Sequence, residues 1–106
     1  MRRLALAFIV IVAAGAGLPA QKSESVIRAG IIGLDTSHAI EFTRILNDAS
    51  AADHVSGAKV VAAFKGGSPD LEASTSRIDK YTEQLRTKWN IEIVPDIPAL
   101  CSKVDA

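Results

Sequence analysis

One stretch in the first third of the chain combines residue types that bind anions. Val26–His38 reads V-I-R-A-G-I-I-G-L-D-T-S-H: an apolar run, a glycine, a polar turn, and the start of a helical pattern at about His38. This order is typical of nucleotide-binding α/β units, because the amide groups at the start of a helix attract phosphate oxygens. The candidate phosphate-binding residues are Gly33, Leu34, Asp35, Thr36, Ser37 and His38.

A second group of polar residues follows the apolar run Ala58–Phe64. Lys65 begins a loop that continues through two glycines to Ser68, Pro69 and Asp70. The Lys65 ammonium can pair with a phosphate, and the Ser68 hydroxyl and the glycine amides can donate hydrogen bonds to one. Ser68-Pro69 also fits a helix N-cap followed by proline at the first helical position. A solvated turn lysine is an equally acceptable interpretation of Lys65.

The same residues support other chemistry less well. Asp35, Ser37 and His38 have the residue types of a nucleophilic triad, but neighbours in sequence seldom point at one another, and no G-x-S-x-G motif is present. Asp35 and His38 are too few to hold a metal, since the other histidine, His54, lies in a separate polar loop. Cys101 is the single cysteine, so it cannot form an internal disulfide, and it fits a buried apolar position.

The elements expected to position these residues alternate between strand and helix. Continuous apolar runs predict parallel strands covered by helices on both faces, and segments with helical spacing separate them. The order β-α-β-α-β-α predicts an α/β fold, part of a doubly wound parallel sheet that stops at the start of a fourth strand. The expected strands are Val26–Leu34, Ala58–Phe64 and Ile91–Val94, with Val104–Ala106 as the beginning of the fourth.

Helical spacing also predicts which side chains pack against the sheet. A short third helix is expected over Ile97–Lys103, and Asp79 and its charged neighbours are expected to face solvent from the second. The expected core residues are Ala39, Phe42, Ile45, Leu46 and Ala49 in the first helix, and Ile78, Tyr81, Leu85 and Trp89 in the second.

The N-terminal residues have the pattern of a secretory signal peptide. Two arginines precede the apolar run Leu4–Leu18, and the small residue Ala20 precedes a polar stretch. We therefore expect residues 1–20 to be an export signal cleaved near Ala20, residues 21–25 to be a linker, and residues 26–106 to fold in the periplasm or outside the cell. The apolar run is shorter than the roughly 20 residues of a spanning helix, so no stable membrane anchor is expected.

Composition and charge indicate one small globular domain. The chain is 48% hydrophobic and 23% charged, which is ordinary for a folded protein. Its 12 basic and 12 acidic residues balance, and two of the basic residues belong to the expected signal. The remainder is mildly acidic, so nothing favours a nucleic-acid partner.

Three segments carry a family resemblance: Ala29–His38 (A-G-I-I-G-x-x-x-x-H), Val60–Phe64 (V-V-A-A-F) and Ile97–Ala106 (I-P-A-L-C-S-K-V-D-A). They resemble the N-terminal domain of the Gfo/Idh/MocA oxidoreductases, the glucose–fructose oxidoreductase and inositol dehydrogenase family, over about Ile27–Ala106. The resemblance implies a partial NAD(P)-binding Rossmann domain in a protein that transfers hydride between a nicotinamide cofactor and a sugar or cyclitol. The family's catalytic lysine motif and substrate domain would follow Ala106. We therefore expect a fragment of a longer protein, with no catalytic residue in this chain.

The phosphate-binding fingerprint departs from the family pattern at two positions. Gly33 matches the first glycine of G-x-G-x-x-G, whereas Asp35 and His38 stand where the second and third belong. A carboxylate at the second position would face the phosphates, and an imidazole at the third would push the helix away or point outward. Alternatively, Asp35, Thr36 or Ser37 caps the helix and occupies the anion site. The protein would then be a non-catalytic exported binding or scaffold protein that has lost the cofactor.

The residue after the second strand bears on the choice of cofactor. Family members that prefer NAD place an acidic residue there to bond the ribose hydroxyls, whereas this chain has Lys65. Lysine favours a 2′-phosphate, so the resemblance implies NADP rather than NAD, with Lys65 and Ser68 at that phosphate and Gly33–His38 around the pyrophosphate. The expected partners are a nicotinamide dinucleotide, a sugar-like small molecule in the complete protein and, because an unfinished sheet edge promotes association, a second copy of the chain.

Overall fold

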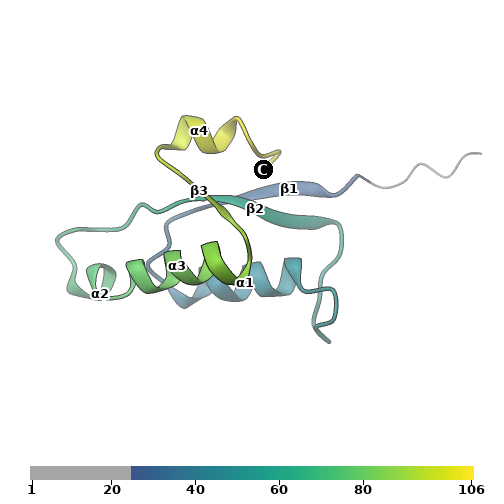
Figure 1. Ribbon diagram of the computed structural model, residues 1–106, viewed down its shortest axis with the longest axis horizontal. Coiled ribbons are helices and arrows are strands. Elements are labelled where there is room, and N and C mark those ends of the chain that lie inside the picture. Colours follow the sequence, from purple (N-terminus) through teal and green to yellow (C-terminus); the bar gives the residue numbers. More distant parts are fainter. Residues whose placement is uncertain (1–24) are drawn as a thin grey trace, which may run out of the picture.

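The computed structural model describes residues 25–106, which form an α/β domain (Figure 1). This confirms the predicted fold class and the parallel sheet. The expected signal peptide and most of the expected linker, residues 1–24, lie outside the described residues. The elements are β1 (Ile27–Ile32), α1 (Ser37–Asn47), β2 (Ala58–Phe64), α2 (Glu72–Thr75), α3 (Ile78–Lys88), β3 (Glu92–Val94) and α4 (Ile97–Cys101).

The sheet has three parallel strands in the order β1-β2-β3. The central strand, β2, is rich in small and branched apolar residues, and its Val60, Ala62 and Ala63 are buried. β1 pairs with it from Ile27 opposite Ala58 to Ile32 opposite Phe64, with one irregularity in register. Because parallel strands all run the same way, their carboxyl ends meet at one edge, and both loops singled out in the sequence lie there.

The last residues of the chain bond to the free side of β1. The Ala106 amide donates to the Arg28 carbonyl at 3.2 Å, and the Gly30 amide donates to the Ala106 carbonyl at 2.8 Å. This is the pattern of a parallel pair in which Ala106 lies opposite Ala29. The Arg28 side chain also bonds the Asp105 carboxylate and lowers the pKa of that group. Residues 104–106 thus occupy the place expected for a fourth strand, without forming a regular strand.

Helices cover both faces of the sheet. α1 and α3 lie on one face and α4 on the other, while α2 lies next to α3 beyond the end of the strands (Figure 1). The larger core cluster, on the side of α1 and α3, includes the fully buried Leu34 and Leu85. A smaller cluster joins Ala62 and Val94 to Leu100 of α4. α4 approaches β1 closely at Gly30, where an added Cβ would lie 3.0 Å from the Leu100 side chain.

Polar contacts fix α1 and the loop after it. The Asn47 side chain bonds both the amide and the carbonyl of Val60 in β2, at 2.8 and 2.9 Å. The Arg44 guanidinium holds both carboxylate oxygens of Asp53, at 2.8 and 2.7 Å. These hydrogen bonds lower the pKa of Asp53. The amino-terminal end of the sheet is therefore closed by a tethered loop, at the opposite end from the candidate residues.

The predicted core is mostly correct for α3, where only Tyr81 stays outside the core clusters, and is partly wrong for α1. In α3, Ile78 and Leu85 are buried and the charged residues are exposed, as expected. In α1, Phe42 is 59% exposed and Thr43 is buried instead, with its hydroxyl bonded to a backbone carbonyl of the preceding turn at 2.8 Å. Because threonine is a polar residue, the spacing of apolar residues does not predict its burial, even though its hydroxyl is hydrogen-bonded inside the helix. The pattern therefore missed Thr43 and placed Phe42 in the core, whereas the predicted Ala39 is buried and Leu46 packs against the core.

Several predicted boundaries are also wrong. Ser68 does not cap a helix: α2 begins at Glu72, and the Ser68 carbonyl accepts the Leu71 amide in a turn at 3.1 Å. α1 ends before Ala49, and α4 ends at Cys101, whose side chain is exposed rather than buried. β1 is shorter than Val26–Leu34, and its end residues Ile27 and Ile32 are exposed.

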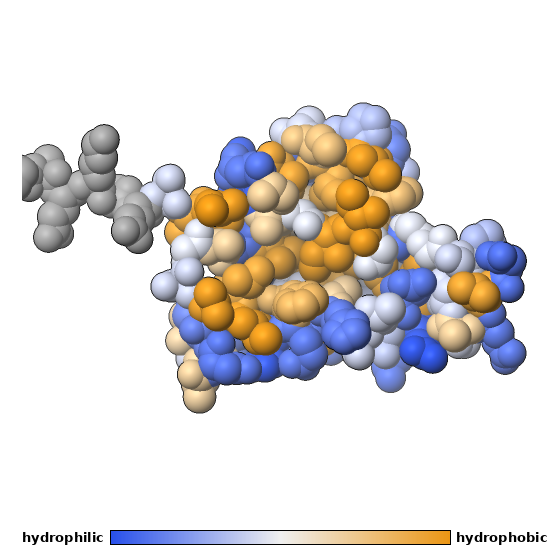
Figure 2. Space-filling view, turned by 180° about the vertical axis from the view of Figure 1, so that it is seen from behind, coloured by the Kyte–Doolittle hydropathy of each residue, from blue (hydrophilic) through white to orange (hydrophobic). Residues whose placement is uncertain are grey.

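Apolar side chains gather on the face of the molecule where β1 lies, on the side of that strand away from β2. Figure 2 shows this face, with apolar surface between α4 at the top and polar groups below. The exposed large hydrophobic residues of the described chain include Ile27 and Ile32 at the ends of β1 and Phe42 of α1. The sheet and α1 are therefore less covered on this side than the sequence pattern predicts.

Candidate functional site

The turn between β1 and α1 begins with a glycine that the backbone conformation requires. Gly33 has a φ of 93°, and an added Cβ would meet no atom within 4 Å, so conformation and not space excludes other residues. The Gly33 amide donates to the Phe64 carbonyl at 3.0 Å, and the Leu34 amide donates to the Lys65 carbonyl at 2.9 Å. With Leu34 buried in the core, the turn is fixed to the end of β2.

The first turn of α1 presents backbone amides without a side-chain cap. Thr36 is the N-cap residue, and its side chain makes no capping hydrogen bond. Asp35 is half-buried, and within residues 25–106 no amide of α1 bonds its carboxylate. The alternative in which Asp35 or Thr36 caps the helix is thus not observed. The Ala39 amide donates to the Thr36 carbonyl at 3.3 Å, whereas the amides of Ser37 and His38 carry the partial positive charge of the helix and are free to bond an anion.

His38 points away from the turn. Its ring stacks on Phe42, one helical turn later, with centroids 6.2 Å apart and planes inclined by 29°. Both side chains are exposed. Of the two arrangements predicted for an imidazole at the third glycine position, the outward one is present.

The loop after β2 lies directly against this turn. Gly66 has a φ of 58°, and an added Cβ would lie 3.3 Å from the Cα of Gly33. On the other side of the loop, a Cβ on Gly67 would lie 2.5 Å from the Ile78 side chain. The two loops singled out in the sequence therefore meet, and the absence of side chains on Gly66 and Gly67 permits both contacts.

A pocket of about 320 Å³ opens between this second loop and the helices α2 and α3. The buried Ser74 hydroxyl shapes it by accepting the Ser68 amide at 2.9 Å. Only Lys65 and Ser68 among its lining residues were predicted as site residues, because the helical residues belong to no motif. The lining consists of Lys65, Gly66, Gly67, Ser68 and Pro69 from the loop, and Ser74, Thr75 and Ile78 from the helices.

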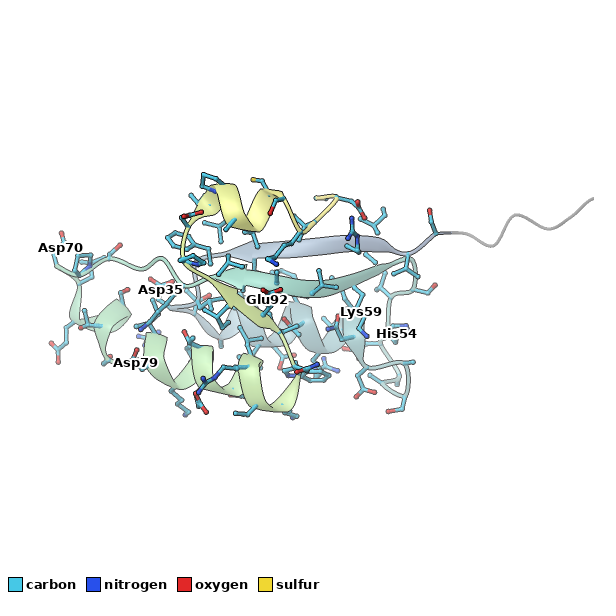
Figure 3. The ribbon with its side chains drawn as sticks, turned by 45° about the horizontal axis from the view of Figure 1, so that its top comes forward. Asp35, His54, Lys59, Asp70, Asp79 and Glu92 are labelled. Atoms are coloured by element: carbon cyan, nitrogen blue, oxygen red, sulfur yellow. The ribbon has the colours of Figure 1, made fainter. Side chains whose placement is uncertain are left out.

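Lys65 is not a free cation in this arrangement. Its ammonium donates a hydrogen bond to the carboxylate of Asp79, in the first turn of α3. Figure 3 shows Asp79 at the same end of the molecule as Asp35 and Asp70, whereas His54 and Lys59 lie at the other end. The sequence indicated only that Asp79 faces solvent. Its pairing with Lys65, 14 residues earlier, follows from the way α3 packs under the sheet.

His54, the other histidine considered for metal binding, has a structural role. A ring nitrogen of His54 lies 2.8 Å from the Ile45 carbonyl, which ties the loop after α1 to that helix. Among residues 25–106, no three histidine, cysteine or acidic side chains lie close enough together to hold a metal ion. The helices of this part of the chain are too short or too polar to cross a bilayer.

The backbone geometry at this edge of the sheet suits a dinucleotide, whereas its acidic side chains disfavour one. The glycine turn, the uncapped amides of α1 and the adjacent pocket are what a pyrophosphate and a ribose need. Asp35 is a half-buried acidic residue directly before the N-cap residue of α1, and the Asp79 carboxylate neutralises the charge of Lys65. The residues present therefore fit the cofactor, with two acidic groups that weaken an anionic ligand.

Comparisons with protein-family models, with curated proteins and with solved structures found no match to this chain.

Proposed function

We propose that the chain is the nucleotide-binding part of an oxidoreductase and binds a nicotinamide dinucleotide at the carboxyl edge of its sheet. The observation that carries the proposal is the arrangement around β1, which has β2 on one side and Ala106, in parallel pairing, on the other. The Gly33 turn consequently lies where the strand order reverses. Ligands of open α/β sheets bind outside the strand ends at such a switch point, and the change of helix face between α3 and α4 supports a doubly wound, Rossmann-like sheet.

Each part of this edge has a role in the proposal. The backbone amides of Asp35–His38, which follow the two amides already bonded to β2, bind the pyrophosphate, and the pocket beside Lys65 and Ser68 receives the adenosine ribose. The bound cofactor would supply hydride-transfer chemistry. The substrate, a sugar or cyclitol according to the family resemblance, and the catalytic residues belong to parts of the protein beyond this chain. Export, directed by residues 1–20, is part of the same proposal.

A second candidate is a non-catalytic binding or scaffold protein that kept the fold and lost the cofactor. The observation that favours it is the place of Asp35, a half-buried acidic residue that directly precedes the N-cap residue Thr36. Two unit charges about 4 Å apart repel by about 1 kcal/mol in water and about 4 kcal/mol at an effective dielectric constant of 20. A repulsion at the lower value would weaken dinucleotide binding modestly, and one at the higher value would prevent it.

Calorimetric titration of NAD and NADP into the wild-type chain, the Asp35→Gly variant and the Asp70→Gly variant separates the two candidates. Asp70→Gly is the matched control, because it removes a carboxylate at the same end of the molecule from a residue that does not line the pocket. If the site binds cofactor, the wild type binds a dinucleotide and Asp35→Gly binds it at least about fivefold more tightly. Binding that appears only in Asp35→Gly supports the second candidate. Absence of binding in all three proteins contradicts a nucleotide site.

A further inference from the structure

The ion pair between Lys65 and Asp79 stands at the rim of the pocket. Lys65 lines the pocket directly, and Asp79 follows Ile78, which lines it from α3. The Lys65 side chain is 44% exposed and that of Asp79 is 82% exposed, so both heads remain accessible to a ligand. The pair thus presents a cation and an anion side by side at the place where β2 ends.

The two groups have complementary hydrogen-bonding capacity. The lysine ammonium has three N–H donors, of which one is used by Asp79, and a carboxylate offers several acceptor sites. A vicinal diol can donate to the carboxylate and accept from the ammonium at the same time. A phosphate dianion can use only the ammonium, whose charge is already balanced, and it is repelled by the neighbouring carboxylate. The pair therefore favours a diol over a phosphate.

We infer that Asp79 determines which ribose this pocket accepts, and that it selects the free 2′,3′-diol of NAD over the 2′-phosphate of NADP. This inference rests on the proposed nucleotide-binding function. Lys65 alone would favour the 2′-phosphate, as the sequence suggests. The end of β2 has no acidic residue, but Asp79 of α3 places a carboxylate next to Lys65. Asp79 acts on the ligand directly, and Lys65 holds its carboxylate in place.

The test measures the dissociation constants of NAD and NADP for the full chain and two variants. Asp79→Asn keeps the size of the side chain and removes its charge, and Asp70→Asn makes the same change at the same end of the molecule, at a residue that is not the partner of Lys65. We expect the wild type to bind NAD more tightly than NADP. In Asp79→Asn the ratio of the two constants should move toward NADP by about tenfold, and in Asp70→Asn by less than about twofold.

The outcomes separate this inference from the proposed function. If the proteins bind a dinucleotide but the ratio is the same in the wild type and in Asp79→Asn, Asp79 does not select the ribose and only the inference is wrong. A wild type that prefers NADP overturns it as well. If neither dinucleotide binds, even when Asp35→Gly is added to the series, the inference and the nucleotide-binding function are both wrong.

Discussion

Two glycines set the geometry of the candidate site for different reasons. Gly33 is required by its φ of 93° alone, whereas Gly66 combines a φ of 58° with close contact to the Cα of Gly33. The sequence predicted the first, because a glycine between a strand and a helix is part of a known pattern. The contact of Gly66 with it depends on how two loops pack, which a linear pattern does not contain. Asp79 was missed for the same reason.

The close contact predicts a local effect of Gly66→Ala. The added methyl group must move the Gly33 turn by a few tenths of an ångström, and the left-handed backbone conformation adds a cost of about 1 kcal/mol. We expect lower stability in urea unfolding and shifted NMR resonances for the amides of Gly33 and Leu34. Gly57→Ala is the control, since Gly57 also has a positive φ but has no atom near the added Cβ. Unchanged resonances for Gly33 in Gly66→Ala would contradict the contact.

The pairing of Asp53 with Arg44 predicts a dependence of stability on pH. The pKa of Asp53 is lowered from its ordinary value of 3.8 by hydrogen bonds from Arg44. The stabilisation is therefore complete above pH 3.8 and is lost as the pH falls through the lower value of the folded state. The urea midpoint of the wild type should exceed that of Asp53→Asn near neutral pH, and the difference should shrink as the pH is lowered below 3.8. A difference that does not change as the pH is lowered would show that the ion pair is not its cause.

At the scale of elements, the sequence predicted the strands and α3 well because their patterns are regular. β2 matched the expected Ala58–Phe64, and the apolar stripe of α3 faces the core. α2 was missed, since the four residues Glu72–Thr75 are too few to show a helical period. In α1 the period predicted a helix correctly but placed Phe42 in the core, where Thr43 lies instead.

The different burial of two apolar side chains, one in α3 and one in α1, predicts unequal costs for their truncation. Leu85→Ala removes a fully buried side chain from the larger core cluster and should cost about 2–5 kcal/mol. Phe42→Ala removes a ring that is 59% exposed and should cost less than about 1 kcal/mol. Urea unfolding of both variants measures this difference. Equal losses would place Phe42 in the core and contradict the packing of α1.

At the scale of the whole molecule, three features converge on the carboxyl edge of the sheet. The loop before the uncapped start of α1 lies there, the loops around Gly33 and Gly66 meet there, and the pocket opens beside them. The alternation of strands and helices predicted the parallel sheet. The balance of charge at this edge could not be predicted, because Asp35, Lys65 and Asp79 come from three separate segments of the chain.

The uncovered face beside β1 is the other feature of the whole molecule. Ile27 and Ile32 lie exposed at the two ends of β1, which beyond β2 is paired only with the last residues of the chain, and apolar surface gathers around that strand (Figure 2). Exposed strand edges and apolar patches favour association with other protein surfaces. Binding studies therefore need a monomeric sample, which sedimentation at several concentrations would establish.

The most direct test of the nucleotide site is residue-resolved NMR of the ¹⁵N-labelled chain titrated with NAD. If the carboxyl edge binds the dinucleotide, the amides of Gly33–His38 and Lys65–Ser68 shift together along one saturable curve. The amides of the tethered loop around Asp53, at the opposite end of the sheet, stay unchanged. Shifts confined to that loop or to the face beside β1, or no shifts at saturating NAD, would contradict a nucleotide site at this edge.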